Sequence, residues 1–179
     1  MSERNTGQVP EDHSIRLLFR TLTERGLGQT NIRDEASIVY VAGIMTDFIS
    51  TDALYPVCDA SGERLEYLTD LVAEADRLTE PSLRRDHFQY LGDLTLFMLG
   101  LFPERFRRNR RAPSRDFYAA QGRRSYRIVA EMVWTPAELA VFRRLADQYE
   151  QYVDGLDWVR RYIRDPFFQY MFREFGISQ

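Results

Sequence analysis

QYLGDLTLFMLGLFPERFRRNRRAPSR, residues 89–115, begins as almost continuous apolar chain and ends as a run of arginines. When residues 86–101 are placed at about 100° per residue, the resulting helix is apolar nearly all round, with one narrow polar strip that includes Asp93. Gly92 and Gly100 lie beside that strip, where they would let a neighbouring backbone approach closely. A helix that is apolar on most sides is normally the central one of a bundle. The stretch therefore predicts a buried central helix followed by a charged loop.

Helical periodicity also dominates the rest of the chain, and we find no convincing alternation of the kind that strands show. The pattern predicts helices over residues 12–25, 33–53, 61–79, 81–102, 114–133 and 135–164, with a short last one after Asp165-Pro166. The GLG at 26–28 is expected to end the first helix. The predicted fold class is all-α: a single-domain bundle of about six to seven helices over residues 12–179, after a disordered leader at 1–11.

The best local signal for a helix start is TPAE at residues 135–138. Its threonine would cap the helix, its proline would occupy the first turn, where no N–H is needed, and its glutamate would complete a capping box. The apolar spacing continues to about residue 164, with Asp154-Gly155 as the candidate bend. Ser114 is the equivalent cap for the helix of 114–133.

The composition is that of an ordinary globular protein, with 44% hydrophobic and 28% charged residues in 179. A net charge of −3 argues against a general affinity for nucleic acid. All 24 basic residues are arginine, which we attribute to codon bias in a GC-rich bacterial genome. Cys58 is the only cysteine, so no intrachain disulfide can form, and a cytoplasmic location is predicted. The longest apolar run, Leu94–Phe102, is too short to span a membrane.

Charge is distributed unevenly along the chain. Nine acids lie between Asp47 and Glu80, and nine arginines lie between Arg105 and Arg127. Three interpretations fit: two faces of opposite sign that are solvated or meet inside the monomer, self-association of the acidic part of one copy with the basic part of another, or an external anion at the basic part. The candidate anion-binding residues are Arg107, Arg108, Arg110 and Arg111. Nucleic acid is the least favoured partner, because this segment has few aromatic residues for stacking.

A candidate ligand pocket lies between the helices predicted over 86–101 and 114–133. Both carry a glycine beside polar groups, so they could pack closely and enclose Asp93. The residues expected near it are Tyr118, Gln121, Ser125 and Tyr126, with His87 at the mouth. One interpretation is a structural polar cluster that fixes the helix register. The other is a small pocket in which Asp93 acts as an acid, a base or a ligand anchor.

No metal or cofactor is predicted. His87 has only His13 as a second histidine, and no EXXH or HXXH pair is present, so a di-iron or zinc site is not expected. Serine nucleophile motifs, phosphate-binding loops and dinucleotide fingerprints are also absent from the sequence. These observations favour a protein that is not an enzyme, without excluding one.

Two motifs lie close together: LGDLTLFMLGLFPERF (residues 91–106) and SRDFYAAQGRRSY (residues 114–126). This combination resembles a family of uncharacterised, all-helical bacterial proteins that share an LGD…LF…GLFPE core and a helix rich in tyrosine and glycine. The likeness covers residues 87–126. It implies a bacterial origin and a helical fold, and it carries no catalytic role.

The sequence therefore predicts a non-enzymatic binding or interaction protein that self-associates or acts as an adaptor. The candidate surfaces are the long amphipathic helix of 135–164 and the aromatic segment FFQYMFREF (residues 167–175), although docking of that segment on its own core is the favoured interpretation. The alternative is a small-molecule or cofactor binder, conceivably an enzyme, with its pocket at Asp93. Binding of an anion by the basic loop is the third hypothesis.

Overall fold

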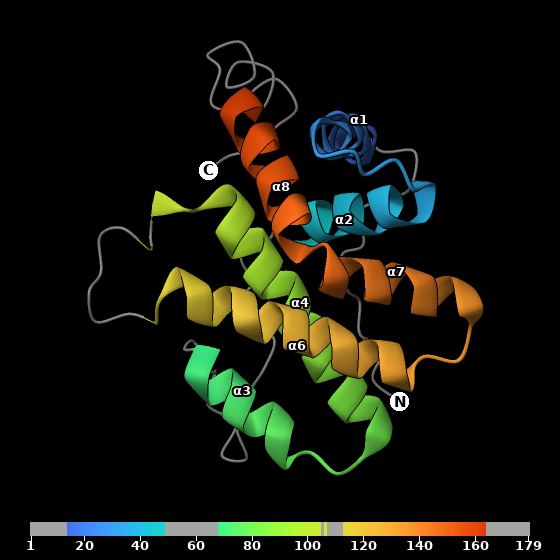
Figure 1. Cartoon of the computed structure of the whole chain (residues 1–179), viewed down its shortest axis with the longest axis vertical. Helices are drawn as coiled ribbons and strands as arrows, with labels where there is room; N and C mark the ends of the chain where they lie inside the picture. Colours follow the sequence, from blue (N-terminus) through green and yellow to red (C-terminus); the bar gives the residue numbers. More distant parts are fainter. Residues whose placement is uncertain (1–13, 49–67, 105, 107–112, 164–179) are drawn as a thin grey trace.

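The computed structural model describes residues 14–48, 68–104, 106 and 113–163, which are coloured in Figure 1. Over these residues the chain is all-α, with seven helices and no strand, as the periodicity predicts. The helices are α1 (Ser14–Gln29), α2 (Glu35–Asp47), α3 (Leu68–Arg77), α4 (Pro81–Leu101), α6 (Arg115–Met132), α7 (Pro136–Asp147) and α8 (Tyr149–Ile163). The predicted leader, Cys58 and the segment 167–175 lie outside the described residues.

The apolar half of the 89–115 stretch forms most of α4, which is the central helix of the fold. It contacts α2, α3, α6 and α8, and eight of its residues are buried. Figure 1 shows α4 and α6 crossing in the middle of the molecule, with α3 on one side of the pair and α1, α2, α7 and α8 on the other. The core therefore surrounds α4, and its apolar circumference is explained by neighbours on most sides.

Two glycines allow α4 and α6 to approach closely. A methyl group built on Gly92 would lie 2.6 Å from a ring carbon of Tyr126, so the tyrosine ring covers the backbone of α4. On α6, a methyl group on Gly122 would lie 2.3 Å from the hydroxyl oxygen of Tyr149 and 2.5 Å from that of Thr95. The Tyr149 hydroxyl donates to Thr95 at 2.9 Å, so Gly122 lies over a buried hydrogen bond between α4 and α8.

The expectation that GLG ends the first helix is wrong, because α1 continues to Gln29. Gly26 lies where α1 crosses α8, and a methyl group there would be 2.4 Å from the carbonyl oxygen of Gly155. Leu27 is completely buried in the core. These residues thus serve helix packing, which local sequence cannot distinguish from a helix stop.

The predicted caps are present, but the predicted bend is in the wrong place. The side chain of Ser114 accepts from the Phe117 N–H, and that of Thr135 accepts from the Glu138 N–H. The helix that begins after Thr135 is interrupted at Gln148, whose φ of −110° lies outside the helical range. Asp154-Gly155 lies within α8 and is not a bend. Gly155 instead provides room for α1.

Gly122→Ala is expected to lower the free energy of unfolding by about 2–3 kcal/mol, because the added methyl group must displace the buried pair of Tyr149 and Thr95. Gly43→Ala is the matched control: a methyl group on Gly43, in the middle of α2, meets nothing within 4 Å. That change should raise stability by about 0.5–1 kcal/mol through helix propensity. Urea denaturation measures both, and equal effects would contradict the crossing described above.

Candidate functional site

The Asp93 carboxylate connects three helices. It lies on α4, and its Oδ1 atom accepts a hydrogen bond from the Tyr40 hydroxyl of α2 at 2.8 Å. The Tyr126 hydroxyl of α6 donates to the same oxygen at 2.9 Å. The side-chain amide of Gln89, one turn earlier on α4, donates to the Tyr40 hydroxyl at 3.1 Å. The polar strip of α4 is therefore the centre of a hydrogen-bond network that ties α2 and α6 to the central helix.

This environment shifts the proton affinity of all three acidic groups. Burial raises the pKa of Asp93 from its usual value of 3.8 to about 7, although the hydrogen bonds from Tyr40 and Tyr126 act in the opposite direction. Burial and the nearby Asp93 raise the pKa of Tyr40 and of Tyr126 well above the usual value of 10. Near neutral pH the network therefore gains or loses one proton, at Asp93, while both phenols keep theirs.

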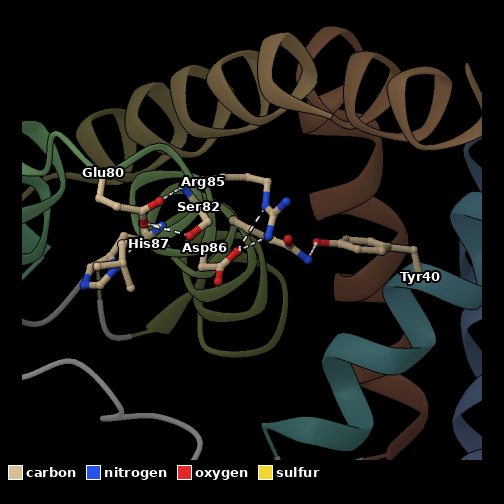
Figure 2. Close-up of polar contacts among 8 residues, drawn as sticks. Tyr40, Glu80, Ser82, Arg85, Asp86 and His87 are labelled. Carbon is tan, nitrogen blue, oxygen red and sulfur yellow. Dashed lines mark hydrogen bonds and ion pairs between the residues drawn. The ribbon is translucent and has the colours of Figure 1, made fainter. Parts of the chain in front are cut away.

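The other residues expected around Asp93 have different surroundings, or no hydrogen-bond partner of their own in the described part of the chain. Ser125 is buried, and neither its hydroxyl nor the Gln121 side-chain oxygen has a hydrogen-bond partner among the described residues. The Tyr118 ring packs edge-on against Phe106, with 4.7 Å between the ring centroids. His87 bonds through Nδ1 to the Leu83 carbonyl oxygen. In Figure 2 the His87 ring points away from Tyr40. Of the residues proposed for the pocket, Tyr126 is hydrogen-bonded to Asp93.

α4 and α6 pack closely at Asp93, and the surface near the network is hollowed on the side of α2 and α7 instead. A groove of about 630 Å³ lies between α2, the first half of α4 and the start of α7. Its polar lining residues include Tyr40 and Gln89, the two that lead to Asp93. Its apolar lining is Ala36, Val39, Val133, Trp134, Ala137, Val141 and Phe142. A smaller hollow of about 390 Å³ adjoins it and shares Arg85, Val133 and Trp134.

Trp134 is the most unusual residue of the groove, because its exposed fraction is 92%. It lies in the three-residue turn between α6 and α7, flanked by Val133, the C-cap of α6, and Thr135, the N-cap of α7. Val39, on the α2 side of the groove, is 48% exposed. Folding does not explain an indole in water, since its burial would be favourable by roughly 2–3 kcal/mol. An exposed aromatic beside a hollow is typical of a binding surface.

The charged groups of the groove are held by their neighbours. The Nε and one Nη atom of Arg85 donate to Oδ1 of Asp86, at 3.0 and 2.8 Å. Figure 2 shows the Arg85 side chain between Asp86 and Tyr40. The Thr135 hydroxyl donates to the Glu138 carboxylate at 2.6 Å and accepts from the Glu138 N–H at 3.2 Å, whereas in the predicted capping box the carboxylate would accept from the Thr135 backbone N–H. The polar side chains of the groove are thus placed by helix starts and by the Asp93 network.

Sequence reasoning missed Tyr40, Gln89 and Trp134 as site residues. Gln89 lies four residues before Asp93 on the predicted central helix, but nothing in the local pattern places it in a pocket. Tyr40 is 53 residues from Asp93, and no local pattern indicates that they meet. Trp134 directly precedes TPAE. That motif predicts where a helix begins, but it does not predict whether the residue before it is exposed. The candidate anion-binding residues Arg107, Arg108, Arg110 and Arg111 lie outside the described residues.

Comparison of the chain with protein-family models, with curated proteins and with solved structures gave no match. Within the described parts of the chain, no group of three or more His, Cys, Asp or Glu residues could hold a metal ion. No helix in those parts is long and apolar enough to cross a membrane. The candidate site therefore rests on geometry and chemistry alone.

Asp93→Asn should remove a pH dependence of stability. Because the folded-state pKa of Asp93 is about 7 and its usual value is 3.8, the folded protein holds this proton more tightly than the unfolded chain. The resulting stabilisation is complete below about pH 4 and is lost as the pH rises to about 7, with an upper bound of about 4 kcal/mol. The asparagine oxygen can still accept from both phenols.

The measurement is the free energy of unfolding of wild type and Asp93→Asn between pH 4 and pH 8. The wild type should lose stability relative to the variant over this range. Asp147→Asn, at an exposed position of α7, is the control and should follow the wild type. Parallel curves for wild type and Asp93→Asn would contradict the raised pKa.

Proposed function

We propose that this chain is a non-enzymatic binding protein that takes a small ligand with an apolar body into the groove beside Trp134. The observation that carries the proposal is the convergence of an exposed indole, apolar walls and two polar side chains, Tyr40 and Gln89, on one hollow of about 630 Å³. Ligand sites are typically hollows of about 300–1,000 Å³ with apolar walls and a few fixed polar groups.

Binding is favoured over catalysis by the kinds of side chain at the groove. Its lining, among the described residues, includes no serine, cysteine or histidine that could act as a nucleophile or shuttle a proton at neutral pH. The Tyr40 phenol keeps its proton, because burial and Asp93 raise its pKa. Asp93, the one group near the groove that titrates close to pH 7, is covered by Tyr40 and is not part of the lining.

Ala137→Phe tests the proposal, because Ala137 is exposed at the start of α7 and lines the groove. The phenyl ring should occupy the space intended for a ligand without disturbing the core. We expect the affinity for a neutral apolar dye such as Nile red to fall by about tenfold or more in a fluorescence titration. Ala120→Phe, at an exposed position of α6 that does not line the groove, should bind like the wild type. Unchanged binding by Ala137→Phe would refute the site.

Self-association is a second candidate function, and the charge polarity of α4 and α6 favours it. Trp134 and the acidic residues Glu80 and Glu131 lie where α4 begins and α6 ends. The arginine-rich segment 105–111 connects the other ends of the same two helices. Figure 1 shows that these two ends lie on opposite sides of the molecule. We infer that one copy would present these arginines to the Trp134-bearing end of the next, where Glu80 and Glu131 lie beside Arg84 and Arg85.

Sedimentation velocity at increasing protein concentration measures this association. It should weaken in Trp134→Ser and in the variant in which Arg107, Arg108, Arg110 and Arg111 are replaced by glutamine. It should also weaken as salt is raised, because exposed charges are screened. A monomer at every concentration and at low salt would eliminate self-association and leave the ligand groove unaffected.

A further inference from the structure

The two hollows that meet at Trp134 carry more negative than positive charge. Glu138 lines the larger hollow, and Glu80 and Glu131 line the smaller one. Among the described residues, Arg85 is the only cation in either lining. Trp134 belongs to both hollows, so its exposed indole has a glutamate in the lining on either side.

The single cation is already engaged, whereas one carboxylate is available. Arg85 is bound to Asp86 through two of its nitrogens, both on one carboxylate oxygen. Glu80 is used as the N-cap of α4, where it accepts from the Ser82 and Leu83 N–H groups. Glu131 is exposed and forms no hydrogen bond or ion pair with another described residue. The charge of Arg85 is therefore balanced by Asp86, whereas the Glu131 carboxylate has no cation opposite it among the described residues.

The exposed tryptophan favours a positively charged ligand, as the glutamates of the two linings do. The face of an indole is the strongest cation–π acceptor among side chains, and it is used to recognise ammonium and guanidinium groups. Trp134 can offer its face because 92% of the residue is exposed. The walls beyond it, at Val39 and Phe142, are apolar and suit a hydrocarbon or aryl body rather than a bare ion.

We propose that the ligand of the groove is a small organic cation, with its ammonium or guanidinium group over Trp134 between Glu131 and Glu138 and its apolar body against Val39 and Phe142. This inference rests on the proposed function and names its ligand class. The occupant is a free small molecule, because the hollow of about 630 Å³ is of ligand size and its polar side chains, Tyr40 and Gln89, are held by internal hydrogen bonds.

The experiment uses Trp134 as its own reporter. The chain has two tryptophans, and Trp158 lies on α8, stacked on Tyr162 with 4.9 Å between the ring centroids. Trp158→Phe keeps that stacking and leaves Trp134 as the single tryptophan. Its fluorescence is titrated with three molecules of the same body and different charge: protonated phenylbutylamine, phenylbutanol and phenylbutyrate. The protein is kept at a concentration where sedimentation gives a monomer.

We expect the ammonium compound to bind at least about tenfold more tightly than the carboxylate, with the alcohol between them. Glu131→Gln together with Glu138→Gln should reduce that ratio to about threefold or less, since glutamine removes the charge but keeps a side-chain oxygen that can accept from the Thr135 hydroxyl. Asp147→Asn, which removes an exposed carboxylate outside the groove, should leave the ratio unchanged.

Equal affinities for the three compounds, or preference for the carboxylate, would overturn the cation assignment while leaving the groove as a binding site. Tighter binding of a peptide with the sequence of residues 105–113 than of phenylbutylamine would also overturn it, in favour of a second copy as the occupant. A further outcome is that none of the three compounds changes Trp134 fluorescence while Nile red still binds wild type more tightly than Ala137→Phe. That result would refute the organic cation as the ligand and leave the groove as a binding site. If the dye does not distinguish wild type from Ala137→Phe either, the groove itself fails.

Discussion

The close crossing of α4 and α6 is the constraint on which the rest of the structure depends. Gly92 has no side chain, so the Tyr126 ring lies directly against the backbone of α4. This approach brings the Tyr126 hydroxyl within 2.9 Å of Asp93. Gly122 makes the same kind of room on α6 for the bonded hydroxyls of Tyr149 and Thr95. Each contact occupies the space that a side chain would fill if the glycine were any other residue. Protein interiors are as densely packed as crystals, so they adjust poorly to an added methyl group.

The hydrogen-bond network carries that constraint from the core to the groove. Asp93 is held by Tyr126 from one side and by Tyr40 from the other, so the position of α2 is linked to the packing of α4 on α6. Tyr40 also lines the groove and stacks edge-on against Phe142 of α7, with 5.2 Å between the ring centroids. A change in the charge of Asp93 therefore acts on a residue of the proposed site without any contact between Asp93 and the ligand. Burial raises the pKa of this carboxyl to about 7, so the charge of Asp93, and with it the hydrogen bond from Tyr40, changes near neutral pH.

The sequence predicts the helical fold and the centre of the network, but it does not predict the groove. The i, i+3, i+4 spacing identifies the helices, and the glycines beside Asp93 correctly mark α4 as the helix that others approach. Asp93 stands out because an ionisable group on an apolar helix needs partners. Tyr126 follows from its place beside Gly122. Tyr40 could not be found in this way, since it meets Asp93 through the arrangement of α2 across the bundle. The interruption at Gln148 was missed for a related reason: the apolar spacing runs through it without a break.

The exposure of Trp134 follows from helix capping. Val133 ends α6 and Thr135 caps α7, so the one residue between them has little conformational freedom and no adjacent chain to cover it. The opposite wall is also rigid, because Val39 and Tyr40 lie on α2, which Asp93 ties to α4. A groove with both walls on ordered elements loses little entropy when a ligand binds, so a modest apolar contact can yield measurable affinity. The same rigidity means that a ligand of the proposed site would be selected by shape and charge rather than by closure of the groove around it. In the proposed site, the choice of ligand is therefore assigned to the carboxylates that line the two hollows at Trp134.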